Sequence, residues 1–476
     1  MRTHLLSLLG LCGLSVVAGC GGGGSPPPFQ NPVPSIATLS PNNYNQNSPG
    51  FTLSVIGSNF ISGSVVQWGG SARPSTLISG NLLTAQISAT DVSTGGSTPV
   101  TVTNPSPGGG ASNSKNFTVP CNIPAPVAAA SQAKARVGAY FFDGWTGSLS
   151  NFHYNGLLYG NYQDREPMSG WEDDNDCAVE KQLAVAHNFG IDFFIYEWYF
   201  NATVNNPGQN LNSALQITST LPDRHGMQFA IMYATGGPFN VPPSGWTAAV
   251  DEWVRYMANP DYVRVNGMPL FVILDVGQMR NVFGDSTGVS TALNQLRVAA
   301  QAQGLPGVYV LGNFGLPEGI LGQPVPCCGL QIAQSDGYDA VQIGAGPFTA
   351  PPVAGMQPFS TLSSIYHWAW DQSALYSPIP AVPVVLDGWD PRPWDERSSA
   401  GILTWYSRSP QELAQLVGDA IDWANANPQL RLEPAPTPPL VLVGSWNEIG
   451  EGNHIVPTVG EGTTYGHALA AMLLGP

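Results

Sequence analysis

Residues 189–199 read FGIDFFIYEWY, a nearly unbroken apolar run that ends in polar and aromatic residues. An apolar run of strand length without alternation is typical of a strand buried on both faces of a parallel sheet. The eight runs of this kind are 137–143, 191–196, 228–233, 270–275, 308–312, 339–344, 382–387 and 440–445. Helical patterns lie between most of them or after the last, at 175–189, 209–221, 246–258, 288–303, 360–376, 409–426 and 461–474. The alternation predicts an α/β fold, a (β/α)8 (TIM) barrel over residues 135–476, with no clear helix in 313–338. A doubly wound open sheet is the alternative, although no GxGxxG follows the first strand.

Carboxylates and aromatic rings follow the carboxyl ends of these strands, which is where such barrels carry their reactive groups. Sugars present hydroxyls to acceptor oxygens and C–H faces to aromatic rings, so we expect a sugar site. The alternatives are core packing for an indole and helix capping for an aspartate. The candidate substrate-binding residues are Asp143, Trp145, Glu197, Tyr199, Tyr233, Asp275, Asp387, Trp389, Asp390, Trp446, Asn447 and His454.

Glu448 and Glu451 are the candidate catalytic residues. Three positions apart in a helical turn, they would place their Cβ atoms ~5–6 Å apart. Retaining glycosidases hold two carboxyl groups ~5–5.5 Å apart, and such proximity raises one pKa toward that of a proton donor. Gly450 and Gly452 would let a ligand approach the backbone. The alternative is a solvated helix start that favours acidic residues. No spacing of metal ligands accompanies these residues, so neither a metal nor a cofactor is expected.

Residues 446–458, WNEIGEGNHIVPT, resemble the WNEWxEGxxIxP signature of glycoside hydrolase family 99-like proteins, which include the WbsX-like polysaccharide group. VGAYFF at 137–142, the run at 189–199 and DGWDPRP at 387–393 extend the resemblance over the second region. It implies a retaining polysaccharide hydrolase, with an α-mannoside as one expected substrate. When the roles of the family's two motif glutamates are transferred to the matching positions, Glu448 is the base that acts on a sugar 2-hydroxyl and Glu451 is the acid/base. Ile449 stands where the family commonly has Trp, and we expect it to alter one sugar contact.

Residues 34–119 contain short alternating runs such as FTLSVI at 51–56 and SVVQW at 64–68, separated by turn residues. This pattern predicts an immunoglobulin-like sandwich. The region resembles the IPT/TIG family, whose domains are usually spacers or binding modules, and its protein partner is unknown. Residues 120–134, PCNIPAPVAAASQAK, are expected to be a linker.

The first 20 residues combine Arg2 with a short apolar run and end in VAGC, which resembles a bacterial lipobox. We therefore expect a lipoprotein signal peptide at 1–20, acylation of Cys20 and a Gly/Pro tether at 21–33. An ordinary signal peptide is the alternative. The expected location is the bacterial cell envelope, exported and lipid-anchored at the outer membrane or periplasmic face.

The low content of charged residues is typical of a protein that works outside the cytoplasm. Only 10% of the 476 residues are charged, and the formal net charge is −16, the wrong sign for tracking nucleic-acid phosphates. With Cys12 and Cys20 set aside, the cysteines Cys121, Cys177, Cys327 and Cys328 remain in an oxidising compartment. A vicinal Cys327–Cys328 bond, or separate bonds from these two to Cys177 and Cys121, are both open.

The resulting hypothesis is an exported, anchored glycoside hydrolase that meets a polysaccharide or oligosaccharide, a membrane through Cys20, and no nucleic acid. The alternatives are a catalytically inactive glycan-binding or adhesion protein and a WbsX-like protein of polysaccharide biosynthesis. Linkage, exo or endo action and oligomeric state stay open.

Overall fold

The structure is a computed structural model that describes residues 30–46, 48–121, 123–125, 134–145, 156–201, 210–315, 329–344, 350–394 and 401–475. The chain divides into two compact units, one built mainly from Ser48–Asp91 and Thr98–Thr118 with the preceding strand, the other mainly from Val119–Pro476. The signal peptide, Cys20, most of the tether, Cys327 and Cys328 lie outside the described residues.

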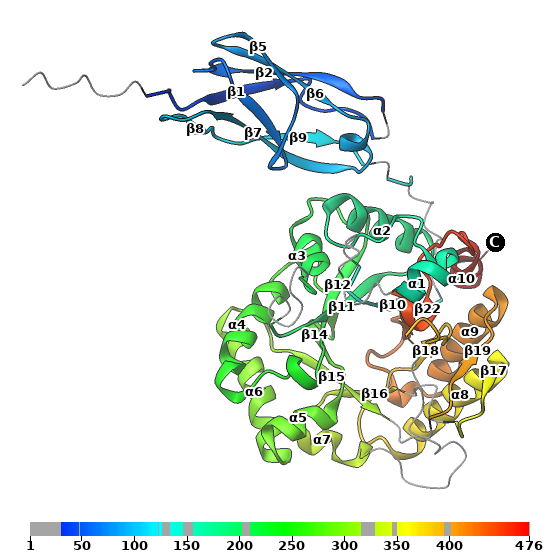
Figure 1. Ribbon diagram of the computed structural model, residues 1–476. Coiled ribbons are helices and arrows are strands. Elements are labelled where there is room, and N and C mark those ends of the chain that lie inside the picture. Colours follow the sequence, from blue (N-terminus) through cyan, green and yellow to red (C-terminus); the bar gives the residue numbers. More distant parts are fainter. Residues whose placement is uncertain are drawn as a thin grey trace, which may run out of the picture. The chain divides into compact units, whose positions relative to one another are not determined.

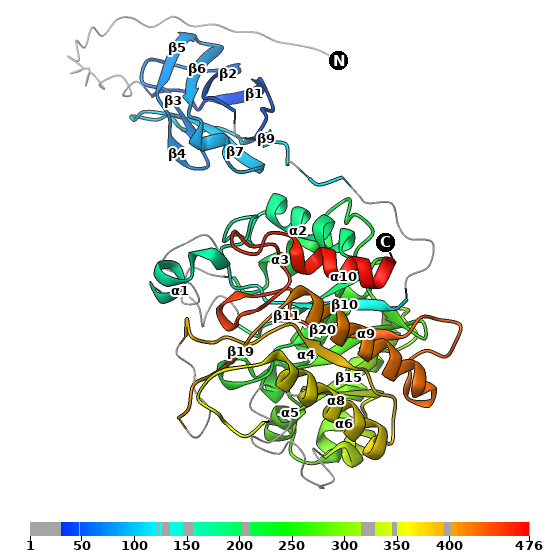
Figure 2. The same ribbon diagram turned by 90° about the vertical axis from the view of Figure 1, so that its right-hand side faces the viewer.

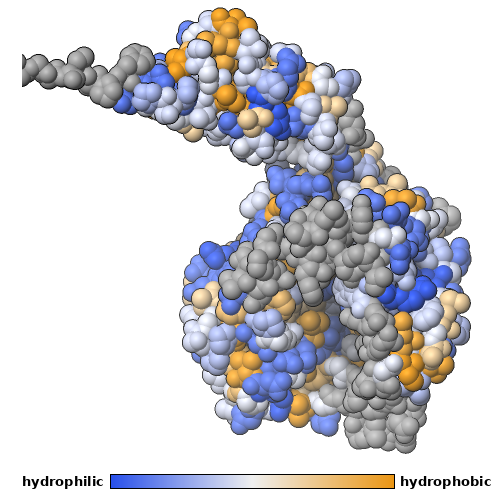
Figure 3. Space-filling view, viewed as in Figure 1, coloured by the Kyte–Doolittle hydropathy of each residue, from blue (hydrophilic) through white to orange (hydrophobic). Residues whose placement is uncertain are grey.

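The first unit is an antiparallel β-sandwich, which confirms the predicted immunoglobulin-like fold class. One sheet has the order β1 (Ser35–Ser40), β2 (Phe51–Ser58), β6 (Leu82–Ile87), β5 (Ser75–Ser79). The other has the order β4 (Ser71–Ala72), β3 (Val65–Trp68), β7 (Gly96–Asn104), β8 (Gly110–Ala111), with β9 (Lys115–Val119) also paired to β7. Alternate residues such as Leu53 and Val55 are fully buried, as expected for strands with one face on a core. Hydrophobic surface gathers over β5 in Figure 3, the strand that carries the exposed Leu77 and Ile78.

The second unit is built on a parallel sheet whose strands follow the chain order. The order in space is β16 (Ala340–Gly344), β15 (Tyr309–Gly315), β14 (Met268–Ile273), β12 (Gln228–Tyr233), β11 (Phe193–Trp198), β10 (Arg136–Phe141), β20 (Leu440–Gly444), β18 (Val384–Leu386). These are the eight predicted strands, shifted by no more than a few residues. A short strand β13 (Arg264–Val265) pairs antiparallel with β14.

Main-chain hydrogen bonds close this sheet into a barrel. The Val341 N–H donates to the Pro380 carbonyl and the Val382 N–H donates to the Val341 carbonyl, each at 2.9 Å. These bonds join β16 to the segment that enters β18, so the last open edge is paired and the predicted (β/α)8 barrel is confirmed. Figure 1 shows the strands at the centre with the helices around them.

The helices cover the outside of the barrel (Figure 2). They are α1 (Gly156–Asn161), α2 (Asp176–Asn188), α3 (Ser213–Thr220), α4 (Trp246–Met257), α5 (Val276–Phe283), α6 (Ser286–Ala302), α7 (Ala333–Asp336), α8 (Phe359–Tyr376), α9 (Pro410–Ala426) and α10 (Thr464–Leu474). The predicted helices are present, whereas α1 and α5 were not predicted. α7 is a single turn, which explains why no helical period is visible in 313–338. Two short strands, β17 (Gly355–Gln357) and β19 (Thr404–Tyr406), pair outside the barrel.

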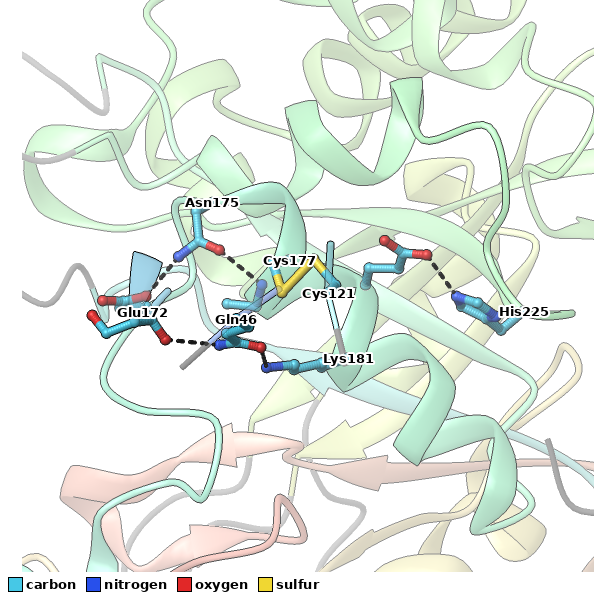
Figure 4. The surroundings of a disulfide bond; sticks show 10 residues. Gln46, Cys121, Glu172, Asn175, Cys177, Lys181 and His225 are labelled. Atoms are coloured by element: carbon cyan, nitrogen blue, oxygen red, sulfur yellow. Dashed lines mark hydrogen bonds and ion pairs between the residues drawn. A yellow bond between two sulfur atoms is a disulfide. The ribbon is translucent and has the colours of Figure 1, made fainter. Parts of the chain in front are cut away.

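One disulfide joins Cys121 to Cys177, the second residue of α2 (Figure 4). This bond excludes the alternative in which these two cysteines pair separately with Cys327 and Cys328. Nearby, the Lys181 ammonium donates to the Gln46 side chain at 3.3 Å, and Asn175 caps α2 by accepting from the Ala178 N–H. Among the described helices, none has the length and apolar character needed to cross a membrane.

Candidate active site

The segment after β20 forms a tight hairpin that carries both candidate catalytic carboxylates. β21 (Asn447–Glu448) pairs antiparallel with β22 (Asn453–His454), and the 3-10 helix η8 (Ile449–Glu451) turns between them. Glu448 precedes this turn and Glu451 ends it, and both are partly exposed. The expected helical turn is thus of the tighter 3-10 type, which brings residues three apart nearly into line. We refer to residues 447–454 as the 447–454 hairpin.

Buried hydrogen bonds fix this hairpin to the first strand. The Asn447 side chain accepts from the Phe142 N–H and donates to the Phe142 carbonyl, each at 2.8 Å. The indole N–H of Trp145 donates to the Asn447 carbonyl at 2.8 Å, and that of Trp446 donates to Gln182 at 2.8 Å. Trp145, Trp446 and Asn447 are at most 1% exposed. These predicted substrate contacts therefore lie in the core, where they have no surface to offer a sugar and instead position the hairpin.

The two glycines of the hairpin make room for side chains of the protein itself. A Cβ atom on Gly450 would lie 2.4 Å from the ring of Trp394, and one on Gly452 would lie 2.7 Å from the Cβ of Asp390. Gly452 also has a φ of +64°, which favours glycine. The interpretation that these glycines expose the backbone to a ligand is wrong, because Trp394 and Asp390 occupy that space.

Ile449 is fully buried. The side chain at this position therefore packs in the interior and makes no contact with a sugar. The departure from the family signature lies in the core, so the expectation that Ile449 alters a sugar contact is wrong.

Glu448 lies near a pair of polar residues at the end of β11. The Tyr199 hydroxyl donates a hydrogen bond to the Glu197 carboxylate. Burial raises the pKa of Tyr199, and the negative charges of Glu197 and Glu448 raise it further. Burial also raises the pKa of Glu197 to about 7, against the opposing effect of the Tyr199 hydrogen bond. Glu197 and Tyr199 are therefore hydrogen-bonded to each other, and Glu448 lies close enough for its charge to act on Tyr199.

A second carboxylate pair lies beneath the hairpin. Asp143 is fully buried, accepts from the Ala214 N–H at 2.6 Å through Oδ2, and leaves Oδ1 without a hydrogen-bond partner. Asp173 accepts from Gln182 at 2.8 Å and from Asn447 at 3.2 Å. Burial, and then the proximity of Asp173, raise the pKa of Asp143, while burial raises that of Asp173 to about 8. Two adjacent buried acids hold protons near neutral pH more readily than they ionise.

A third cluster surrounds the end of the hairpin. The Arg408 guanidinium donates to the Asp387 carboxylate at 2.7 Å, to the His454 carbonyl at 2.5 Å and to Glu461 at 3.2 Å. Burial raises the pKa of Asp387 to about 7, although Arg408 acts against this. Burial and then the Arg408 charge lower the pKa of His454 to about 4, so this imidazole is neutral at pH 7.

Asp390 joins two arginines. Its carboxylate accepts from Arg165 and, through both oxygens, from Arg392 at 2.7 Å. Burial acts to raise the pKa of Asp390, but these guanidinium groups outweigh it and lower the pKa. The backbone N–H of Asp390 donates to the Glu451 carbonyl at 2.5 Å, which connects this cluster to the hairpin.

The remaining predicted residues lie away from open surface or have structural roles. The Tyr233 hydroxyl accepts from the Val241 N–H at 2.5 Å, and its ring lies within a buried aromatic cluster. Asp275 caps α5 by accepting from the Gly277 N–H, the capping role considered above. Trp389 is 6% exposed.

Sequence reasoning missed several residues of these clusters. Asp173, Arg408 and Glu461 lie in loops and Arg165 ends the 3-10 helix η2 (Gln163–Arg165), so the pattern of barrel strands gave no signal for them. The Tyr140 hydroxyl, which donates to Gln342 at 2.6 Å between β10 and β16, was likewise hidden within apolar runs. Among the described residues, no group of three or more His, Cys, Asp or Glu is arranged to hold a metal ion.

Comparison with known families agrees with the resemblance noted in the sequence. Residues 241–469 match a family model described as Glycosyltransferase WbsX. The matched residues lie within the barrel. No curated protein matches the chain.

Solved structures similar to the barrel include a GH99 endo-α-mannosidase from Bacteroides thetaiotaomicron, with 13% identity over 72% of this chain and 96% of that chain and a TM-score of 0.47. An exo-β-1,4-mannosidase from an Opitutaceae bacterium has 10% identity over 73% of this chain and 61% of its own, with a TM-score of 0.40. The TIG domain of human nuclear factor of activated T-cells, cytoplasmic 4, has 19% identity over 21% of this chain and 93% of its own, with a TM-score of 0.15.

Proposed function

We propose that the barrel is a retaining glycoside hydrolase that cleaves a polysaccharide, with Glu448 and Glu451 as its catalytic pair. The observation that carries this proposal is the 447–454 hairpin, which places two partly exposed glutamates at the two ends of one 3-10 turn after β20. Its buried supports, Asn447 and Trp446, give that turn a rigid base. Rigid placement of paired carboxyl groups is what glycosidic cleavage requires.

In this proposal Glu451 protonates the oxygen of the leaving sugar and then activates water. Glu448 acts as a base on the neighbouring 2-hydroxyl, which attacks C1 and gives a 1,2-anhydro sugar, the route that the family resemblance implies. An ordinary double displacement, with Glu448 as nucleophile, uses the same pair of carboxylates. A substrate that lacks the 2-hydroxyl separates the routes, because only double displacement can cleave it.

Glu197 and Tyr199, which are partly exposed, are the proposed contacts to the sugar. The two are hydrogen-bonded to each other, and the charge of Glu448 acts on Tyr199. We further propose export and attachment to the cell envelope through an acylated Cys20, so that the barrel meets glycans outside the cytoplasm.

The test is hydrolysis of an α-mannan and α-glucan panel by the purified chain, with product anomers followed by NMR. Glu451→Gln and Glu448→Gln should each reduce the rate by several orders of magnitude while the proteins remain folded. Asp251→Asn, an exposed change on α4, is the matched control and should leave the rate unchanged. Full activity in Glu451→Gln would refute the assignment.

A glycosyltransferase is the second candidate, favoured by the description of the matching family. It predicts binding of a nucleotide sugar and transfer to an acceptor glycan. Calorimetric titration with GDP-mannose and UDP-glucose distinguishes the two functions, because the proposed hydrolase should bind neither.

A further inference from the structure

A polar pocket of about 450 Å³ adjoins the 447–454 hairpin. It is bounded by the segment that follows α1, by the segment that follows β18 and by the segment that joins β22 to α10. We call it the arginine–tyrosine pocket, after the side chains that define it: Tyr162, Arg165, Arg392, Arg408, Glu461 and Tyr465. Its volume lies within the ~300–1,000 Å³ of ordinary small-molecule sites.

The pocket is connected to the proposed catalytic pair through the backbone. Gly452, the residue after Glu451, is part of its wall. Arg165 donates to the carbonyl of Ile449 at 3.1 Å, so one guanidinium contacts both the pocket and the turn. The pocket therefore adjoins the turn that carries Glu448 and Glu451.

Carboxylates outnumber guanidinium groups around the pocket, with Asp164, Asp387, Asp390 and Glu461 against Arg165, Arg392 and Arg408. Arg165 and Arg392 share the carboxylate of Asp390. Arg408 pairs with Asp387 and Glu461. Since each guanidinium already has a carboxylate, an added anion would have to break an ion pair or meet a carboxylate. The −16 net charge of the chain also repels polyanions.

Aromatic rings hold the guanidinium groups in place. The Arg408 guanidinium carbon lies 4.2 Å from the ring centroid of Tyr465, and that of Arg165 lies 4.8 Å from the ring centroid of Tyr162. The Arg392 guanidinium carbon lies 4.6 Å from the ring centroid of Trp405 and its side chain is 38% exposed, so part of this donor fork is open to solvent. An open donor fork beside carboxylate acceptors matches the vicinal hydroxyls of a neutral sugar.

We propose that the arginine–tyrosine pocket binds a neutral sugar residue of the glycan substrate, at a position remote from the bond that is cleaved. This inference rests on the proposed function and names its substrate class: a neutral glycan of several sugar residues, rather than a uronate-rich or sulfated one. Longer neutral chains are then held at two places, at the catalytic pair and at the pocket.

The test measures binding directly, without turnover, in the full chain carrying Glu451→Gln. The probes are methyl α-mannoside, methyl α-glucoside and methyl β-galactoside as neutral ligands, with methyl glucuronide and inorganic sulfate as anionic ones, each followed by saturation-transfer NMR and titration. At least one neutral glycoside should bind saturably. Arg392→Ala should weaken that binding about tenfold, the loss expected for one hydrogen bond to a charged group. Tyr162→Ala is the second variant, and the exposed Arg255→Ala on α4 is the matched control.

Three outcomes would each overturn the proposal. The first is binding of the anionic probes alone, and the second is the absence of saturable binding by every neutral glycoside. The third is binding of neutral glycosides that is equal in both pocket variants and in the control. Because no cleavage is measured, the result is independent of the catalytic assignment. If the pocket variants lose sugar binding while the Glu451→Gln protein still hydrolyses the substrate, the catalytic pair is refuted and the proposed sugar-binding pocket is supported.

Discussion

The side-chain amide of Asn447 forms two hydrogen bonds with the backbone of Phe142, each 2.8 Å long, across a sequence separation of 305 residues. This pairing joins the end of the first barrel strand to the hairpin after the last one. The proposed catalytic residue Glu448 is the next residue in the chain. Its position thus depends on barrel closure as well as on local turn geometry.

Replacing Asn447 with leucine should lower the free energy of unfolding by about 2–4 kcal/mol, because it removes both side-chain hydrogen bonds to the buried backbone of Phe142. Urea unfolding followed by tryptophan fluorescence measures the change. Asn281→Ala, on the exposed side of α5, should remain within about 0.5 kcal/mol of the native protein. Equal stability of both variants would show that the Asn447 bonds contribute nothing.

Gly452→Ala should displace the hairpin and reduce hydrolysis, because the new Cβ would meet Asp390 at 2.7 Å and the φ of +64° disfavours alanine. We expect a loss of about 1–3 kcal/mol in stability. The matched control is Gly418→Ala within α9, where the nearest atom to a Cβ lies 4.0 Å away and helix propensity predicts a gain of up to about 1 kcal/mol. Thermal unfolding of the two variants should move in opposite directions.

Arg408→Ala should destabilise the protein by about 3–5 kcal/mol, since it leaves the fully buried Asp387 without its counter-charge. Arg408→Lys keeps the charge but loses part of the donor fork, so an intermediate loss is expected. Chemical denaturation at pH 7 gives both values. A lysine variant as unstable as the alanine variant would mean that geometry matters here and charge does not.

Asp143→Asn should reduce the dependence of stability on pH. Burial raises the pKa values of Asp143 and Asp173, the latter to about 8, whereas unfolded aspartates ionise near ~3.9. Between about pH 4 and pH 8 the folded state therefore binds more protons than the unfolded state, and stability falls as pH rises, by up to ~1.4 kcal/mol per pH unit for each proton. The asparagine oxygen can keep the Ala214 hydrogen bond while removing one charge beside Asp173. The difference in unfolding free energy between pH 5 and pH 8 should shrink in the variant, and an unchanged difference would contradict this account.

Tyr199→Phe should shift the acidic limb of the kcat/KM profile to higher pH by about one unit. The hydroxyl stabilises ionised Glu197, whose pKa burial raises to about 7, so its removal raises that pKa further. The effect requires that Glu197 act as a charged acceptor of a sugar hydroxyl. Tyr256→Phe on α4 is the control and should keep the native profile.

The barrel was predictable because its strands are continuous apolar runs separated by helices of ordinary length. The runs at 191–196 and 228–233 correspond closely to β11 and β12. α5 escaped prediction because it starts directly at its Asp275 cap after β14, with no loop to mark the boundary. The single turn of α7 is too short for a period to be visible.

The candidate site was only partly predictable. Strand-end position pointed to Glu197 and Tyr199, which form a hydrogen bond, and to Glu448, whose charge acts on Tyr199. The same argument could not separate Trp145 or Trp446, which are buried, from rings at the surface, because an indole serves either role. Asp387 pairs with Arg408, 21 residues away, and Asp390 pairs with Arg165, 225 residues away, and a single sequence carries no signal for such pairings.

The burial of Ile449 has a consequence for how relatives of this chain should be compared. A fully buried residue is constrained by the side chains that pack against it and does not contact a ligand at the surface. Substitutions at this position among homologues should therefore accompany compensating substitutions in the residues packed around it. They should not correlate with the glycan that each homologue uses. Grouping homologues by the residue at position 449 would then separate them by core packing and not by substrate.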